Sequence, residues 1–367
     1  MIGRVQATRR AVRSSTFVAA ASRWRTRASI SPRGFTLAIV AIAGFNAVLG
    51  IGAIVALAPY AWATDVERNL TAAADLVAGR FGTDRGYLYS PLAAVLTVPA
   101  TWLPVGVAIG GWLALRLAIL IEGIRRETEG WRPVDRVAAG VAAVTFVPTL
   151  YDLMLGNVTI LMTASVAVVA WSRDRIAAGI ALGAFLAMAP KPALAPILIW
   201  MLVYRRRALV GTVGAAVVTT AGCVLLVGLE PYLAYVNILR RPQYLDGPQQ
   251  LGNMALTAMP PGVAIVLGAI AVVVTLVALR RGETPGFIAV LAAGLLLAPY
   301  TMAYGPVMLL LAFRPLLAVG PIRAFCLAMT GSLMVIVSLP LWAFAWLAAV
   351  LSVARETWAD RAPTVAR

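Results

Sequence analysis

Apolar runs about as long as a lipid bilayer is thick recur along almost the whole chain, and the first begins at Phe35. Short connectors that contain arginine, proline and glycine separate each run from the next. A run of about 20 apolar residues spans the hydrocarbon as a helix, because only a helix or a closed barrel pairs every backbone group without water. The runs lack the alternation of barrel strands. The sequence therefore predicts an all-α polytopic membrane protein.

The composition excludes a water-soluble protein. Of the 367 residues, 61% are hydrophobic and 13% are charged, whereas globular proteins are roughly half apolar and a quarter charged. A formal net charge of +16 would suggest nucleic-acid binding in a soluble protein. Here the arginines fall at the ends of apolar runs, so they indicate orientation in the membrane. We expect membrane lipids as partners and no nucleic acid.

The residue types that hold metals or cofactors are scarce. Histidine is absent, and Cys223 and Cys326 both lie inside apolar runs, where a thiol behaves as a small hydrophobic group. Histidine is the commonest metal ligand and general base. The sequence has no glycine-rich nucleotide loop, metal-ligand cluster or nucleophile elbow. We expect no metal site, no disulfide framework and no cofactor.

The first 33 residues carry eight arginines and no acidic residue, directly before the first apolar run. Cytoplasmic segments are enriched in arginine and lysine, so this end is predicted to be cytoplasmic. The expected organisation is a basic segment at 1–33, one membrane domain at 34–354 and a cytoplasmic tail at 355–367. The protein is thus predicted to lie in the cell membrane with both termini inside.

Tracing the runs from the cytoplasmic N-terminus predicts about 12 spans, some of them short re-entrant or half-length helices. The segment 91–103 is too short to span, so we expect a half-buried helix there. The two long outer loops are predicted at about 64–90 and 229–261. Every dense arginine cluster then lies on one side. The exceptions are Arg240 and Arg241 in the second outer loop and Arg68, Arg80 and Arg85 in the first.

Asp65 follows the end of the first run by a few residues, in the sequence WATDVERNL. A carboxylate at a membrane interface can reach a lipid-borne substrate while it stays in contact with water. The alternative is an ordinary solvated helix start, in which Thr64 or Asp65 is the N-cap. The residues alone leave both readings open.

Lys191 is the only lysine in the chain and stands between Pro190 and Pro192. The prolines predict a break between two half-length helices, which would leave the lysine short of the outer surface. A cation there usually marks a pathway or an anion partner, and backbone donors freed by the break could join it around a phosphate. The alternative is a lysine whose ammonium reaches the interface along its flexible stem.

Other polar positions give weaker signals. Tyrosines stand beside proline in YLYSPL (87–92) and LAPYTMAYGP (297–306), which the aromatic belts of membrane proteins also explain. Asp152, Gly156 and Asn157 form a polar turn between two runs, which a glycine helix cap also explains. Arg116 lies inside an apolar run, with Glu122 as its acidic neighbour along the helix.

Taken in order, these segments resemble glycosyltransferase family 87 of the GT-C type, with the polyprenyl-phosphate-mannose-dependent mannosyltransferases of phosphatidylinositol mannoside synthesis. The likeness runs from Asp65 to about Pro306. Ser90 stands where the family has the first proline of its Tyr-Pro-Pro-Leu segment. The segments that carry the resemblance are LTAAADLVAGR (70–80), YSPLAAVLTVPATWLP (89–104), GNVTILM (156–162), SRDR (172–175), IALGAFLAMAPKPALAPIL (180–198) and LGNMAL (251–256).

The resemblance implies a membrane glycosyltransferase whose site faces outward. A sugar, mannose before arabinose, would pass from a polyprenyl-phosphate donor to a hydroxyl of a lipid or glycan acceptor, with inversion and without metal. Asp65 would be the catalytic base. Lys191 with Arg240 or Arg241 would bind the donor phosphate. The residues expected to bind the substrates are Tyr89, Asn157, Asn253, Tyr300 and Tyr304.

Two alternatives belong to other classes of protein. A transporter or flippase also needs broken helices and an intramembrane charge, and it predicts internal repeats with matching breaks. We find no convincing repeat. A noncatalytic membrane scaffold is the second alternative, and it predicts that deletion of the chain removes no glycolipid.

Overall fold

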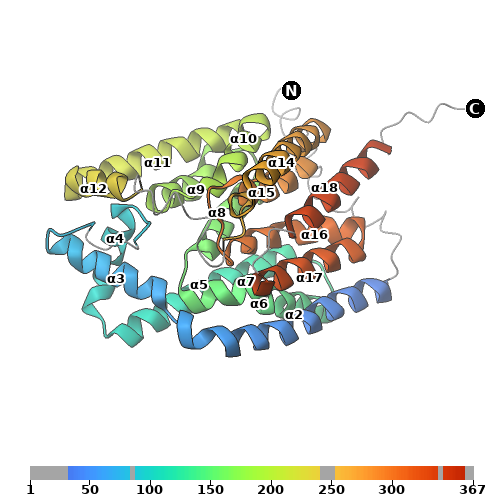
Figure 1. Ribbon diagram of the computed structural model, residues 1–367, viewed down its shortest axis with the longest axis horizontal. Coiled ribbons are helices and arrows are strands. Elements are labelled where there is room, and N and C mark those ends of the chain that lie inside the picture. The colour runs from blue at the N-terminus through green and yellow to red at the C-terminus, as the bar shows by residue number, and fades with distance from the viewer. Residues whose placement is uncertain (1–31, 83–86, 240–252, 338–341, 360–367) are drawn as a thin grey trace, which may run out of the picture.

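A computed structural model describes residues 32–82, 87–239, 253–337 and 342–359. Within these ranges the chain forms helices and no strand (Figure 1), which confirms the all-α prediction. The longest helices are α2 (Pro32–Ala61), α5 (Val105–Glu127), α11 (Arg206–Val227) and α14 (Pro261–Arg281). The others are α3 (Thr64–Val77), α4 (Pro91–Thr97), α6 (Pro133–Thr145), α7 (Val147–Leu155), α8 (Thr159–Trp171), α9 (Ile176–Met188), α10 (Ala195–Tyr204), α12 (Glu230–Leu239), α15 (Glu283–Leu297), α16 (Leu310–Val319), α17 (Pro321–Val337) and α18 (Trp342–Ala359), with the 3-10 helices η1 (Val98–Trp102), η2 (Pro192–Leu194), η4 (Leu256–Ala258) and η5 (Gly305–Leu309).

The prediction of about twelve spans is not supported. In the described residues only α2, α5, α11 and α14 are long and apolar enough to cross a membrane, and a fifth span requires α6 and α7, which meet at 57°. Proline and glycine breaks divide the remaining apolar sequence into helices of 10–17 residues, which are shorter than the roughly 20 residues that a span requires. One of these breaks separates α9 from α10 and contains Pro190 and Pro192.

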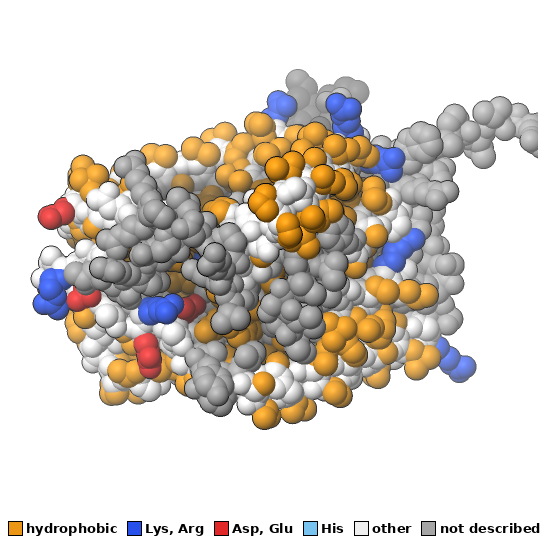
Figure 2. All heavy atoms as spheres, viewed as in Figure 1, with side chains coloured by type: hydrophobic (Ala, Val, Ile, Leu, Met, Phe, Trp, Pro, Cys, Tyr) orange, Lys and Arg blue, Asp and Glu red, His pale blue; other side chains and the backbone are white. Residues whose placement is uncertain are grey.

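The long helices expose apolar side chains outward. Only 17–33% of their most apolar windows is buried inside the protein, and Val55 of α2, Val218 of α11 and Ile265 of α14 are more than two-thirds exposed. Figure 2 shows hydrophobic side chains over much of the face in view, while the acidic side chains in view gather toward the end that carries α3 and α12. Apolar faces of this extent mark a membrane protein.

Several pairs of helices pack closely together. Helix α2 packs against α6, α7 and α17, and α9 packs against α11 and α8. The α9–α11 contact is close, because a Cβ on Gly179 or on Gly211 would collide with a backbone carbonyl of the other helix. This contact fixes the first turns of α9, the helix that leads into the segment with Lys191.

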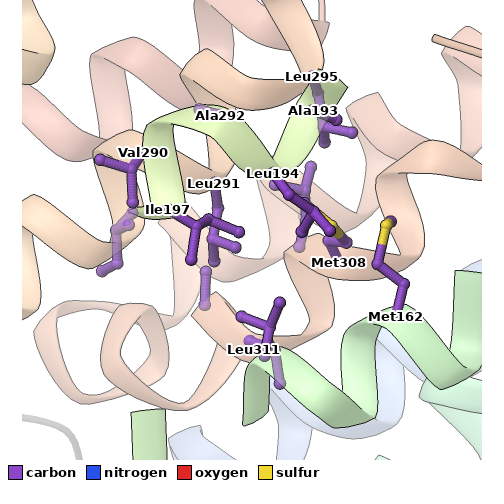
Figure 3. Packing of buried hydrophobic residues seen from close by; sticks show 14 of the residues in the cluster. Met162, Ala193, Leu194, Ile197, Val290, Leu291, Ala292, Leu295, Met308 and Leu311 are labelled. Atoms are coloured by element: carbon purple, nitrogen blue, oxygen red, sulfur yellow. The ribbon is translucent and has the colours of Figure 1, made fainter. Parts of the chain in front are cut away.

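Helix α15 forms the centre of the core and is buried on every side from Pro285 to Leu296, as expected for a helix that is apolar all round. Figure 3 shows Ile197 beside Leu291 and Ala193 beside Leu295 of this helix. The residues directly after Lys191 are therefore held against the core.

The short helices α3, α4 and α12 lie together at one end of the molecule (Figure 1). The segment 91–103 forms α4 followed by η1, as the predicted short helix requires, and Pro91 to Ala94 pack inside the protein whereas η1 has no buried residue. Its position along the outer face of the membrane stays a prediction. The predicted outer loop 64–90 contains α3, and the loop 229–261 contains α12 and η4. These short elements place the polar residues described next.

Candidate active site

Asp65 lies in the first turn of α3, directly beside the end of α7. The backbone N–H of Ala63 donates to the carbonyl of Met154 at 2.7 Å, and Ala63 takes the left-handed conformation with φ 57°. Ala63 is the N-cap of α3, and no side chain caps this helix. The alternative reading of Thr64 or Asp65 as N-cap is therefore wrong, and the Asp65 carboxylate is available for other contacts.

Asn157 joins Asp65 to Tyr89. Its Nδ2 donates to Asp65 Oδ2 at 2.6 Å and to the Tyr89 phenol oxygen at 2.9 Å. The Tyr304 phenol shares this electrostatic environment, since burial and then the Asp65 carboxylate raise its pKa well above the usual value. Asn157 is 1% exposed, so these contacts form away from solvent. Four residues predicted from separate motifs thus share one cluster.

Lys191 reaches the same cluster from the break between α9 and η2. Its Nζ lies 5.0 Å from the centre of the Tyr89 ring and 6.0 Å from that of Tyr304. In the described part of the chain, the ammonium makes these two ring contacts and no hydrogen bond or ion pair. Aromatic faces stabilise a cation without neutralising it. The site therefore presents a positive charge that an anion can still bind.

The tyrosines form the walls around Lys191. Tyr89 packs edge-to-face on Tyr87, and Tyr304 stacks on Tyr151 with an interplanar angle of 18°. Burial raises the pKa of the Tyr89 phenol well above its usual value, and the nearby Asp65 carboxylate raises it further. This phenol stays protonated at neutral pH and can donate a hydrogen bond.

Ser90 holds Tyr89 next to Lys191. Its hydroxyl donates to the carbonyl of Ala187 at 2.5 Å, and its N–H donates to that of Met188 at 3.0 Å. Both carbonyls belong to the last turn of α9, three to four residues before Lys191. The serine that departs from the family's proline thus supplies two bonds between these segments, which a proline could not make.

A buried ion pair lies behind Asn157, and sequence reasoning missed it. Arg116 of α5 lies 3.6 Å from the Asp152 carboxylate, with side chains that are 2% and 0% exposed. Arg116 also donates to the backbone carbonyls of Asp152 at 2.7 Å and Leu153 at 3.0 Å. Glu122, the acidic neighbour along the helix, binds Arg125 and Arg126.

The turn that carries Asn157 is held from two sides. Trp112, one helical turn before Arg116, donates its indole N–H to the carbonyl of Gly156 at 2.7 Å. Gly156 has φ 82°, and a Cβ there would collide with Val66 of α3. Glycine is required by both the backbone conformation and the close approach. The one sequence signal for these contacts is the spacing of Trp112 and Arg116, which lie four residues apart in an apolar run.

Two carboxylates and two cations interact within the cluster, and Arg68 lies 3.9 Å from Asp65 at its edge. Asp65 and Asp152 are both close enough to Arg116 and to Lys191 to interact electrostatically. An anionic substrate group that enters the site would therefore meet Lys191, which forms no ion pair with either carboxylate in the described residues. Across the described residues, no group of three or more His, Cys, Asp or Glu could hold a metal ion.

The other predicted substrate residues lie at the edge of the cluster or outside it. Tyr300 and Lys191 line one small hollow of about 30 Å³, which is room for about one water molecule. Asn253 accepts hydrogen bonds from the N–H groups of Ala255 and Thr301, both at 3.0 Å, so it joins two loops. Arg240 and Arg241 lie outside the described residues. A larger hollow of about 480 Å³ is lined mainly by apolar residues of α5, α6, α8 and α16.

Fold and site together define a helical membrane protein with a carboxylate and an ammonium around buried tyrosines. The model of glycosyltransferase family 87 matches residues 87–302, more than half of the chain. The chain belongs to glycosyltransferase family 87, which confirms the resemblance and makes it a membrane glycosyltransferase. No curated protein and no solved structure matches it. Asp65 precedes the matched region and contacts it through the hydrogen bond from Asn157.

Proposed function

We propose that this glycosyltransferase moves a sugar, mannose first, from a polyprenyl-phosphate donor to a hydroxyl of a lipid or glycan acceptor. The observation that carries the proposal is that Asp65 and Lys191 approach the same residue, Tyr89, from two sides. The carboxylate reaches the phenol through Asn157, and the ammonium lies over the ring. A base for the acceptor and a cation for the leaving phosphate are the two charges that this transfer requires.

Asp65 acts as the general base. Asn157 occupies its Oδ2 at 2.6 Å, and the nearest cation to Oδ1 is Arg68 at 3.9 Å. Oδ1 takes the acceptor proton while the acceptor oxygen forms its bond to the anomeric carbon. The bond from that carbon to the phosphate oxygen breaks on the opposite face, and its electron pair leaves with the polyprenyl phosphate. The product has the inverted configuration.

Lys191 stabilises the departing phosphate. The ammonium is half-buried between tyrosine rings, where a charge interaction is stronger than in water. Protonated phenols of Tyr89 and Tyr304 can add hydrogen bonds to the same oxygens. The cation takes the place that a metal ion has in many phosphate-transfer sites. Arg240 and Arg241 remain proposed as further phosphate ligands.

The direction of the helices supports a site on the extracytoplasmic face. Helix α5 contacts the site with Trp112 and Arg116 and ends after Arg125 and Arg126. Helix α10 begins just after Lys191 and is followed by three arginines at 205–207. Arginine-rich helix ends stay in the cytoplasm. This rule would put the opposite helix ends, and the site, outside.

The experiment measures transfer by purified protein in liposomes that contain radiolabelled polyprenyl-phosphate mannose and an extract of cell lipids. Asp65→Asn should lower kcat by about 10²- to 10⁴-fold, while Asp75→Asn should not change it. Asp75 is the matched control, because it lies on the same helix and pairs with the exposed Arg80 at 3.2 Å. Lys191→Met should lower kcat/KM by about 10²-fold or more, and Lys191→Arg by less.

An Asp65→Asn protein that folds and transfers sugar at the wild-type rate would remove the base assignment. Unchanged donor affinity and rate in Lys191→Met would remove the phosphate assignment. Label that crosses the liposome membrane without reaching an acceptor would favour the flippase instead. Lipid and glycan profiling of a deletion strain then names the acceptor, because the unmodified acceptor accumulates.

A further inference from the structure

The amide of Asn157 has its direction set by a neighbour that the proposed mechanism does not use. The hydroxyl of Thr159 donates to Asn157 Oδ1 at 2.8 Å, and Thr159 is 1% exposed. With the oxygen held on that side, the NH2 group points at Asp65 and Tyr89. A reversed amide would turn its oxygen toward the Asp65 carboxylate, and two acceptors would face each other.

Thr159 is itself fixed by the buried ion pair. Its backbone N–H donates to Asp152 Oδ1 at 3.2 Å, and Asp152 lies against Arg116. The contacts therefore run without interruption from Arg116 through Asp152, Thr159 and Asn157 to Asp65. Every member before Asp65 is at most 1–2% exposed, so water does not compete for these hydrogen bonds.

The hydrogen bonds leave Asn157 little capacity for a substrate. An asparagine amide has two N–H donors, and both are taken, one by Asp65 and one by Tyr89. Its oxygen already accepts from Thr159. Because both donors of Asn157 already bind Asp65 and Tyr89, this residue is better suited to fixing the positions of those two side chains than to binding a sugar.

We propose that Asn157 and Thr159 are positioning residues for Asp65: Thr159 sets the direction of the Asn157 amide, and the amide holds one carboxylate oxygen so that the other faces the acceptor hydroxyl. This inference rests on the proposed function, in which Asp65 is the base. It assigns to Asn157 a role other than substrate binding and gives Thr159 a role that the sequence did not suggest.

The test compares Thr159→Val, which removes the hydroxyl at nearly constant volume, with Thr159→Ser, which keeps it. Thr159→Val should lower kcat by roughly 10- to 100-fold with the donor KM unchanged, because a misdirected base affects the transition state. Thr159→Ser should recover most of that loss. Thr163→Val is the matched control and should transfer at the wild-type rate, since the Thr163 hydroxyl bonds only the backbone carbonyl of Thr159, at 2.8 Å.

A second variant gives a readout that a purely structural role would not move. Asn157→Asp sets a carboxylate against Asp65, and the pair then shares a proton. The acid limb of the kcat profile should shift to higher pH by about one unit or more. The groups that face Asp65, and that stay unchanged in this variant, are Arg68, Arg116, Asp152, Lys191, Tyr89, Tyr151 and Tyr304.

Asp65→Asn is measured beside these variants so that two kinds of failure differ. A fully active Asp65→Asn protein would refute the proposed function. An inactive Asp65→Asn with a wild-type Thr159→Val would refute this inference alone, as would a Thr159→Val that raises the donor KM and keeps kcat. If Thr159→Val does not fold, Asn157→Asp decides, because a pH profile that coincides with the wild type overturns the proposal.

Discussion

Helix α5 carries two sets of ion pairs with opposite environments. Arg116 and Asp152 are 2% and 0% exposed and lie 3.6 Å apart. Glu122 is 43% exposed and contacts Arg125 at 2.7 Å and Arg126 at 2.6 Å. The exposed contacts are the shorter ones, yet they join residues of one helix. The buried arginine also donates hydrogen bonds to two backbone carbonyls of α7. Burial and backbone contacts, rather than distance, therefore determine how much an ion pair contributes to the stability of the fold.

The largest effect is expected from breaking the buried pair. Arg116→Met leaves the Asp152 carboxylate buried without its cation, which costs about 3–5 kcal/mol of unfolding free energy. Unfolding in detergent micelles, followed by circular dichroism against denaturant, measures the loss. The double variant Arg116→Met/Asp152→Leu should recover part of it, since no charge is then left alone. A single variant as stable as the wild type would contradict the comparison.

Gly156→Ala should have the next largest effect. The residue sits at φ 82°, and the added methyl meets Val66, so we expect a loss of about 2 kcal/mol or more. Val66→Ala in the same chain should restore the part that comes from the collision. Activity should fall further than stability alone explains, because α3 must move and takes Asp65 with it. Equal rates for Gly156→Ala and the wild type would show that the turn does not position the base.

Trp112→Phe removes one hydrogen bond, from the indole to the Gly156 carbonyl at 2.7 Å, and keeps an aromatic ring in place. The expected loss is about 1 kcal/mol, smaller than for Arg116→Met. The same denaturant curves measure it. A loss as large as that of Arg116→Met would mean that the indole holds the turn as strongly as the guanidinium does.

The smallest effect is expected at the exposed pairs. Glu122→Gln should leave both the unfolding midpoint and the transfer rate unchanged, because Arg125 and Arg126 remain free to bind water. Thermal unfolding at low and at high salt checks this, since an exposed ion pair that contributes is weakened by salt. A lower midpoint would indicate that this end of α5 supports the fold as well.

The sequence predicted what depends on local chemistry. Prolines on both sides of Lys191 indicated the break between α9 and η2, and Gly156 indicated the turn after α7. The membrane class followed from the apolar runs alone. These features are decided within a few residues, so reading along the chain was sufficient.

What the sequence did not predict depends on contacts between distant segments. Asp65 and Asn157 are 92 residues apart and Arg116 and Asp152 are 36 apart, and no local pattern pairs them. The predicted number of spans was not supported because hydropathy measures only the length of an apolar segment. It does not distinguish a helix whose side chains face outward from a helix such as α15, which is buried within the protein. The family resemblance placed Asp65 and Lys191 in one predicted site, and the hydrogen bonds show that Asn157 lies between Asp65 and Tyr89.

The two partners of the hydrogen bond between Asp65 and Asn157 are synthesised at different times. Translation completes α3 before it reaches α5, α7 and α8, so the Asp65 carboxylate exists for 92 residues of elongation before its amide partner is made. Tyr304 comes later still, after α15. A nascent chain interrupted before that point can have its first long helices and no complete site. The proposed catalytic centre therefore cannot be complete before Tyr304 has been synthesised.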